Sequence, residues 1–585
     1  MLSQRPGPVV GVGSPRQPAP PPSRLPWTRF AGVGLLFLCA VGFLSLGLHE
    51  AWRDSPTFDE PVYVSAGLAA VLHHDVSYNA EHPLLPKVVA VLPVLFAHPV
   101  VPANGHWSGN DERSYSATFV NAQRRAGRLR DVTFASRLAP LLEAVALAFV
   151  LYGLGRDLFG RAAGLFAALL WLASPLVLGL AHLDVLDVPF ALAATGWSWG
   201  LLRWLRQPTT GRALALGFLT AAAVLTDVTG LLLAAIAAAA VLALGWRRSH
   251  RRAVGQCAVV LLVAWATVWA LYGALDPRVL LDPTVILPAP YLHGIAYLGR
   301  NDTVAGPGYL FGAAWTGGRW WYWPGALLVK TVPTTLLVLV VGPVAWLALG
   351  RTTRREAALV LGAPALCLLA FTLAMPRDIG VRYLLPVVAL WLVAASAVVG
   401  VARRHLVGVV LAAAVVGSAG LATALSAPDS LAWAAPPFAP AYRVVTNSDV
   451  DWGQGLYQLQ QWSKGKDPWV AYFGPRGLGV NAVPGARRLL GADPAHVVGW
   501  VAVSATDLTS AERAPLAWLR AYCPVGQLAG SILLYRFAHA PSRESGPARP
   551  AGLCPADARE TSRREIAQAA LPVRPVVGAS AGMVG

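Results

Sequence analysis

Apolar runs long enough to form membrane-spanning helices recur along most of this chain, separated by short polar or basic stretches. Each run approaches the roughly 20 residues that a bilayer core requires. The eleven runs cover residues 30–49, 135–153, 162–181, 189–205, 213–226, 228–246, 253–273, 326–348, 357–375, 383–401 and 406–426. The pattern predicts a polytopic α-helical membrane protein with about eleven transmembrane helices. Its weakest boundary lies at Asp227, between the two shortest runs.

The composition supports lipid as the natural solvent of these runs. Hydrophobic residues make up 55% of the 585 residues, and charged residues only 13%. A soluble globular chain carries roughly 25% charged residues. This much apolar sequence therefore exceeds what a water-soluble core can bury.

The net charge of +17 raises the possibility of nucleic-acid binding. The arginines, however, gather in every second loop between apolar runs, which is the positive-inside pattern of cytoplasmic loops. These loops hold Arg156 and Arg161; Arg203, Arg206 and Arg212; Arg247, Arg248, Arg251 and Arg252; Arg351, Arg354 and Arg355; and Arg403 and Arg404. We therefore expect a lipid bilayer and no nucleic acid as partner. We predict that the protein lies in the cytoplasmic membrane as a multi-pass protein. Its N-terminus is predicted to be cytoplasmic, and its C-terminal region to lie outside the cell membrane.

Changes in composition predict four parts of the chain. Residues 1–29, rich in proline and basic, read as a disordered cytoplasmic tail. Residues 30–426 form the transmembrane domain, in which the long first outer loop, 50–135, is the candidate functional segment. Residues 427–540 are predicted to form a small extracytoplasmic α/β domain, and residues 541–585 are predicted to be a disordered tail.

Within the predicted C-terminal domain, strands are expected at Arg443–Thr446 and Trp469–Phe473, with a helix at Trp452–Trp462 between them. Asn447-Ser448-Asp449 is expected to cap that helix. Cys523 and Cys554 lie in the polar C-terminal part, and whether they form a disulfide stays open.

Two adjacent carboxylates, Asp59 and Glu60, directly follow the first apolar run. They can cap the helix that follows and complement its dipole. The same outer loop also carries Glu81, His82 and Lys87. Lys87 can snorkel at the membrane interface, but a lysine can also hold a phosphate, and an aspartate can take a proton from a hydroxyl.

These motifs resemble glycosyltransferase family 39, whose fold is called GT-C and which includes the protein O-mannosyltransferases and the lipid A aminoarabinose transferases. The resemblance spans roughly residues 30–540. Its motifs are Phe58-Asp59-Glu60-Pro61 with Ala66-Gly67; Glu81-His82-Pro83-Leu84 with Lys87; His182-Leu183-Asp184-Val185-Leu186-Asp187-Val188-Pro189; Trp320-Trp321-Tyr322-Trp323-Pro324 with Lys330-Thr331; Gly380-Val381-Arg382-Tyr383-Leu384-Leu385-Pro386; and Asn447-Ser448-Asp449-Val450-Asp451-Trp452-Gly453-Gln454.

The resemblance implies an inverting transferase that moves a sugar from a polyprenyl-phosphate donor to an extracytoplasmic hydroxyl. Asp59 is then the general base, with Glu60 as the alternative, and Lys87 and Arg382 neutralise the donor phosphate. The acceptor can be a protein, a glycolipid or a glycan. One departure stands out, since family members often carry a lysine where this chain has Asp227.

The remaining candidates are expected to position the acceptor or substrate. Asp187 can position the acceptor or orient Lys87. Alternatively, it is a solvated acid of the loop with no such role. His82 is expected to be a structural hydrogen-bonding residue. Glu81 and Tyr383 are the other two residues expected to position the acceptor or substrate. Glu81, His82 and Asp59 can in principle bind a divalent cation, but no cofactor is expected.

Two other functions stay open from the sequence. A polytopic lipid or glycan transporter or flippase places ionisable groups near the bilayer midplane, whereas the acids here cluster at outer helix ends. A catalytically inactive relative that binds lipid or a partner is the other alternative.

Overall fold

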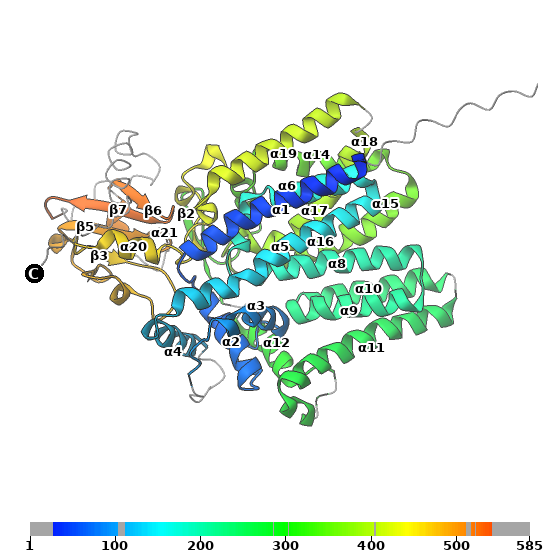
Figure 1. Cartoon of the computed structure of the whole chain (residues 1–585), viewed down its shortest axis with the longest axis horizontal. Coiled ribbons are helices and arrows are strands. Elements are labelled where there is room, and N and C mark those ends of the chain that lie inside the picture. The colour runs from blue at the N-terminus through cyan, green and yellow to red at the C-terminus, as the bar shows by residue number, and fades with distance from the viewer. Residues whose placement is uncertain are drawn as a thin grey trace, which may run out of the picture.

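The computed structural model describes residues 27–102, 112–247, 249–282, 284, 286–301, 304–402, 405–509, 516–520 and 522–540. The predicted tail 541–585 lies outside these residues, as do residues 1–26 of the predicted N-terminal tail. The first helix begins at Trp27, inside that predicted tail. The chain is mostly helical, with a β-sheet at one end (Figure 1).

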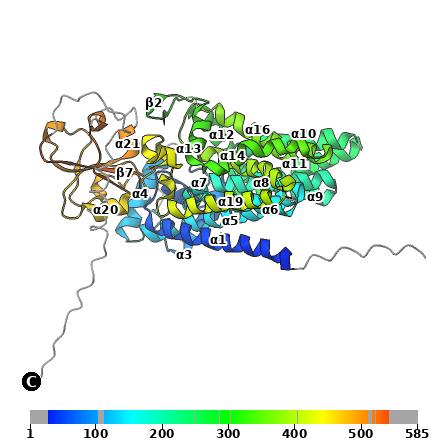
Figure 2. The same ribbon diagram turned by 90° about the horizontal axis from the view of Figure 1, so that it is seen from above.

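Most of the helices run side by side and form one helical body (Figures 1 and 2). They are α1 (Trp27–Arg53), α5 (Leu129–Phe159), α6 (Arg161–Leu172), α7 (Pro175–Ala181), α8 (Asp187–Arg206), α9 (Thr210–Thr226), α10 (Gly230–Trp246), α11 (His250–Leu275), α13 (Tyr322–Lys330), α14 (Pro333–Val341), α15 (Arg351–Ala357), α16 (Ala363–Leu373), α17 (Leu385–Ala395), α18 (Ala397–Ala402) and α19 (Leu406–Ser426). A short 3-10 turn, η4 (Val381–Leu384), leads into α17.

Six helical segments are long and apolar enough to cross a membrane: Gly32–Arg53, Leu129–Phe159, His250–Leu275, Arg351–Leu373, Val381–Ala402 and Leu406–Ser426. The pair α6 and α7, bent by 60°, makes a seventh if it is one broken span. These correspond to seven of the eleven predicted runs, so the chain is a multi-pass membrane protein. The other four runs lie in α8, α9 and α10 and across α13 and α14, and the number eleven stays a prediction.

The long segment between α1 and α5 folds into three helices, α2 (Glu60–Leu72), α3 (Leu84–Phe96) and α4 (Glu112–Arg125). The helix expected after Asp59 and Glu60 is therefore confirmed as α2. Another helix, α12 (Ala289–Asn301), and a short hairpin of β1 (Pro307–Leu310) and β2 (Ala313–Thr316) belong to the segment between α11 and α13.

The C-terminal part contains a five-stranded sheet in the order β4-β3-β5-β7-β6. Its strands are β3 (Trp469–Ala471), β4 (Arg487–Arg488), β5 (Gly499–Ser504), β6 (Gly526–Leu528) and β7 (Ile532–Phe537), accompanied by α20 (Leu456–Ser463) and α21 (Ala505–Thr509). Strand β3 is parallel to β4 and β5, and β7 is antiparallel to β5 and β6.

Two local predictions for this region are wrong. Residues 443–446 form a 3-10 turn and a single bridge from Val445 to Leu310 instead of a strand. Asn447, Ser448 and Asp449 form their own turn, η8, and α20 starts later, with Gly455 at its N-cap. Backbone contacts with Leu310 and Phe311 hold the first segment, and Tyr322 of α13 and Val381 of η4 hold the second; local sequence preference does not report such distant contacts. Cys523 is disulfide-bonded, and Cys554 lies outside the described residues.

Candidate functional site

The loop that carries Asp59 is fixed by one buried arginine from α5. Arg137 is fully buried and donates hydrogen bonds of 2.8 Å to the carbonyls of Ala51, Asp54 and Ser55. It also donates to both carboxylate oxygens of Glu60 at 2.7 Å. Planar, bidentate pairing of this kind is strong and directional. The end of α1 and the start of α2 are therefore tied to the N-terminal third of α5.

Glu60 is saturated by this arrangement. Besides Arg137, its carboxylate accepts from the backbone N–H groups of Thr57 and Asp184, each at 2.7 Å. Burial by itself raises the pKa of Glu60, but Arg137 and these N–H groups outweigh burial and hold the pKa below its ordinary value. Glu60 is thus an ionised structural anchor, 1% exposed.

Asp59, the neighbouring residue, faces a different environment. It occupies the N-cap of α2, but its side chain does not cap that helix. Its side chain is 24% exposed, and Oδ2 lies 3.4 Å from Nη2 of Arg382. Of the two adjacent carboxylates, Asp59 is the one that a substrate hydroxyl can approach.

Arg382 lies in η4, and its side chain is only 8% exposed. Its guanidinium stacks on the rings of Tyr383 and Trp452, at 4.9 and 4.2 Å from their centroids, and Nη1 lies 3.7 Å from Oδ2 of Asp187. Its Nε is buried and has no hydrogen-bond partner in the described part of the chain. The group is therefore pre-oriented and still has an unused donor.

Residues 447–456, here called the crossing segment, hold η4 in place. Asp449 accepts from the backbone N–H of Val381 at 2.8 Å and from the hydroxyl of Tyr322 at 2.9 Å. Gly380 has φ of 140°, and a Cβ there would lie 2.0 Å from Oγ of Ser448. Only glycine fits this close approach without strain.

The crossing segment also holds the loop of Asp59. The N–H of Phe58 donates to the carbonyl of Trp452, and the N–H of Ser55 to the carbonyl of Gln454, both at 2.9 Å. Oγ of Ser55 donates to the carbonyl of Gly453 at 2.8 Å. One stretch of backbone therefore sets the separation of Asp59 and Arg382.

Lys87 is more enclosed than a free phosphate-binding cation. Its side chain is fully buried, and Nζ donates to the carbonyls of Asn79 and His82 at 2.7 Å. Burial lowers the pKa of Lys87 to about 7, although the charges of Glu81 and Glu112 oppose that shift. The residue closes the turn between α2 and α3.

His82 packs edge-on against Tyr63, with 5.5 Å between the ring centroids. Burial, and next the positive charges of Lys87 and Arg382, lower the pKa of His82 to about 3, so its ring is neutral. Glu81 lies 3.8 Å from His82. No group of three metal-ligating side chains occurs among the residues that the structure describes.

The other candidates gather around Arg382. The hydroxyl of Tyr383 accepts from Nη2 of Arg382 at 3.3 Å. Asp187 begins α8, and Asp227 lies at the end of α9, where it accepts from the N–H and hydroxyl of Thr229. Asp227 therefore caps its own turn.

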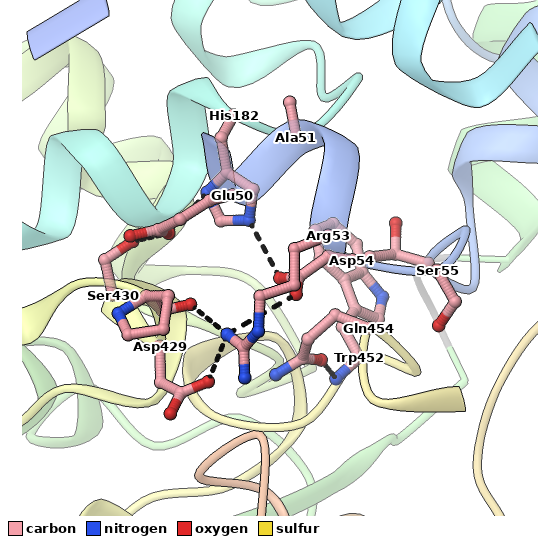
Figure 3. A network of polar contacts seen from close by, with 12 residues as sticks. Glu50, Ala51, Arg53, Asp54, Ser55, His182, Asp429, Ser430, Trp452 and Gln454 are labelled. Atoms are coloured by element: carbon pink, nitrogen blue, oxygen red, sulfur yellow. Dashed lines mark hydrogen bonds and ion pairs between the residues drawn. The ribbon is translucent and has the colours of Figure 1, made fainter. Parts of the chain in front are cut away.

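A second buried polar network joins α1 to the start of the C-terminal part (Figure 3). His182 lies 3.4 Å from Glu50 and 3.3 Å from Asp54, while Arg53 pairs with Asp429 at 2.7 Å. Figure 3 shows Glu50 and Asp54 on either side of the imidazole. The network anchors residues 428–430 to the C-terminal end of α1.

Sequence reasoning missed the residues that position the site. A usable signal existed for Arg137, since an isolated arginine inside an apolar run usually pairs with a carboxylate. For Asp449 and Trp452 the signal was only their place in a motif. Tyr63 had none beyond its position one helical turn after Asp59.

The comparisons with known proteins agree with the motifs. Residues 128–272, which hold α5 to α11, match the family of dolichyl-phosphate-mannose-protein mannosyltransferases. No curated protein matches the chain. Among solved structures, ArnT from Cupriavidus metallidurans bound to undecaprenyl phosphate is 19% identical, with a TM-score of 0.41, covering 70% of this chain and 68% of that one.

The archaeal oligosaccharyltransferase AglB from Archaeoglobus fulgidus, in complex with an inhibitory peptide and a dolichol-phosphate, is 12% identical. Its TM-score is 0.42, and the match covers 85% of this chain and 73% of that one. The family match confirms that this multi-pass membrane chain is similar to the mannosyltransferases of glycosyltransferase family 39.

Proposed function

We propose that this protein is a membrane glycosyltransferase that moves a sugar from a polyprenyl-phosphate donor to an acceptor hydroxyl outside the membrane. The observation that carries the proposal is the contact between Asp59 and Arg382. These residues are 323 positions apart in the chain, yet their side chains meet at 3.4 Å. A base and a phosphate-binding cation side by side are what such a displacement needs.

In the proposed reaction the acceptor oxygen attacks the anomeric carbon as the bond from that carbon to the phosphate oxygen breaks. The acceptor proton passes to Asp59, and the bonding electrons leave with the polyprenyl phosphate. A single displacement of this kind inverts the anomeric carbon.

Arg382 binds the departing phosphate, using the buried Nε that has no partner among the described residues. Its stacking on Trp452 and Tyr383 fixes the direction of the guanidinium, so little side-chain freedom is lost when the phosphate arrives. Lys87 adds positive charge behind the loop while its N–H groups hold Asn79 and His82. Asp187 and Tyr383 orient Arg382, and Glu60 positions Asp59.

The membrane arrangement belongs to the same proposal. Eleven spans with a cytoplasmic N-terminus place Asp59, Lys87, Asp187 and Arg382 on the outer face of the cytoplasmic membrane. A donor with an isoprenoid tail can then stay in lipid while its head reaches this face. The parts 30–426 and 427–540 are proposed as the transmembrane and extracytoplasmic domains.

The test is transfer of labelled sugar from polyprenyl-phosphate donors by the purified protein and by Asp59→Asn. Asp131→Asn is a matched control, because Asp131 is an exposed acid in the first turn of α5. We expect Asp59→Asn to lose transfer and to keep binding of polyprenyl phosphate. Full activity of Asp59→Asn removes Asp59 as the base. Movement of intact donor across vesicles without any transfer by the wild type favours the flippase alternative.

A further inference from the structure

A cavity of about 310 Å³ lies beside the loop between α2 and α3, outside the contacts of Asp59 and Arg382. Its size is at the lower end of the range for small-ligand sites. The residues that line it are Ser77, Asn79, Ala80, Glu81, Glu112, Pro290, His293, Ala296, Tyr297 and Arg300. Most of these side chains are polar, so the cavity suits a hydrophilic ligand.

One wall is a single face of α12. His293, Ala296, Tyr297 and Arg300 follow the spacing of residues on one side of a helix. The helix approaches the opposite loop closely, since a Cβ on Gly294 would lie 1.9 Å from the carbonyl oxygen of Ala80. This backbone contact fixes the distance between the two walls.

The other wall is built by hydrogen bonds. Nδ2 of Asn79 donates to Glu112 at 2.8 Å and to Glu81 at 3.3 Å. The carbonyl of Asn79 is held in turn by Lys87. Two carboxyl groups from different elements are thus fixed side by side at the cavity.

This wall is close to the proposed reaction centre. The charge of Asp59 is near enough to contribute to the pKa of Glu81, which burial, and next Glu112, raise well above the ordinary value. His82, the residue after Glu81, packs on Tyr63, one helical turn from Asp59. The wall residue Glu81 is therefore joined to the surroundings of Asp59 through His82 and Tyr63, whose N–H donates to the carbonyl of Asp59.

We propose, on the basis of the proposed function, that this cavity binds a carbohydrate acceptor and presents one of its hydroxyls to Asp59. Adjacent carboxyl groups accept from neighbouring sugar hydroxyls, and one that is protonated also donates. The guanidinium of Arg300 and the imidazole of His293 supply further donors, and the ring of Tyr297 offers a face to the sugar C–H groups. A glycan acceptor uses all of these groups, whereas a serine or threonine side chain uses only one or two.

The cavity can be filled without changing any residue of the proposed catalytic site. Ala296→Leu puts a larger side chain into it. Gly299→Leu is the matched control, because a Cβ on Gly299 meets no atom within 4 Å. Glu112→Gln is the second variant, since its amide oxygen can still accept from Asn79 while the negative charge is lost.

The first experiment measures binding of a panel of methyl glycosides to the purified full chain by saturation-transfer NMR. We expect binding to the wild type and to Gly299→Leu, and about ten-fold weaker binding to Ala296→Leu and Glu112→Gln. Binding that is equal in all four proteins overturns the proposal, as does a wild type that binds none of the glycosides.

The second experiment separates this proposal from the proposed function. Affinity for polyprenyl phosphate alone should be unchanged by Ala296→Leu, whereas the acceptor KM in glycan transfer should rise about ten-fold. Failure of the wild type to bind the polyprenyl phosphate or to transfer sugar contradicts the proposed function instead. Transfer to a threonine peptide, with no transfer to glycans and no effect of Ala296→Leu, contradicts the carbohydrate assignment alone.

Discussion

Replacing Glu60 by glutamine tests which of the two adjacent acids is the base and which is the anchor. Glu60 accepts four hydrogen bonds of 2.7 Å, two from Arg137 and one each from the N–H groups of Thr57 and Asp184. A glutamine has one acceptor oxygen and one amide NH₂. In either orientation, its NH₂ faces one N–H of Arg137 and one backbone N–H, so two bonds are lost.

The magnitude follows from burial. Arg137 is completely buried, and removing the negative partner of a buried pair costs about 3–5 kcal/mol because the remaining charge is uncompensated. Asp59→Asn changes a longer, 3.4 Å contact of a partly exposed acid and leaves Arg382 paired with Asp187, so its cost should be smaller than that of Glu60→Gln. We therefore expect Glu60→Gln to lower both stability and transfer, and Asp59→Asn to lower transfer alone.

The assay combines thermal unfolding in detergent with transfer kinetics for the wild type, both variants and Asp131→Asn. Since Glu60 positions the loop, the residual activity of Glu60→Gln should keep the pH dependence of the wild type. A Glu60→Gln protein that unfolds like the wild type and loses only catalysis would refute this assignment, because the base would then be Glu60.

Three further outcomes follow from the contacts. Trp452→Leu removes the ring under Arg382 and should weaken polyprenyl-phosphate binding roughly two- to thirty-fold, whereas Trp452→Phe should retain most of the affinity. Equal binding by the wild type and both variants argues against a role for stacking. Gly380→Ala introduces a Cβ 2.0 Å from Oγ of Ser448 at a φ of 140°, which should cost about 1–3 kcal/mol of stability, and the added change Ser448→Ala should recover part of it in the same thermal assay. Folding raises the pKa of Glu81 from 4.5 to about 8, through burial and next Glu112, so the folded state favours its protonated form. The contribution of Glu81 to the free energy of unfolding is therefore complete below pH 4.5 and is lost as the pH rises toward 8. Glu81→Gln should flatten that part of the curve of Tm against pH; an unchanged slope would assign it to another group.

The sequence predicted the membrane helices well because hydrophobic length is a local property. Six of the predicted runs are helices long and apolar enough to cross a membrane, and 162–181 is the bent pair α6 and α7. The bend at Ala173 and Ser174 was not predicted, since Ser174 there starts a new helix by accepting from Val177. The predicted single run at 326–348 is also interrupted, between α13 and α14 and just before Pro333, and this break was not predicted either.

The candidate site was predicted less completely because its geometry comes from distant contacts. Motif resemblance singled out Asp59, Lys87 and Arg382, but not which groups surround them. The hydrogen bonds of Lys87 to the carbonyls of Asn79 and His82 were not predicted, and its phosphate contact stays a prediction. The partner of Glu60 is 77 residues away in the chain, and no spacing rule connects the two.

The crossing segment explains why residues after α19 matter to a site that lies between the helices. It bonds to the Asp59 loop through Phe58 and Ser55, and to η4 through Val381. Lys330 of α13 adds a third attachment, since its buried ammonium donates to the carbonyls of Leu431 and Asp449. Because the attachments reach α13, η4 and the loop after α1, a shift of the crossing segment moves base and cation relative to each other. The C-terminal part holds the segment as well, since the N–H and the hydroxyl of Thr506 in α21 donate to Asp451 at 2.9 and 2.8 Å.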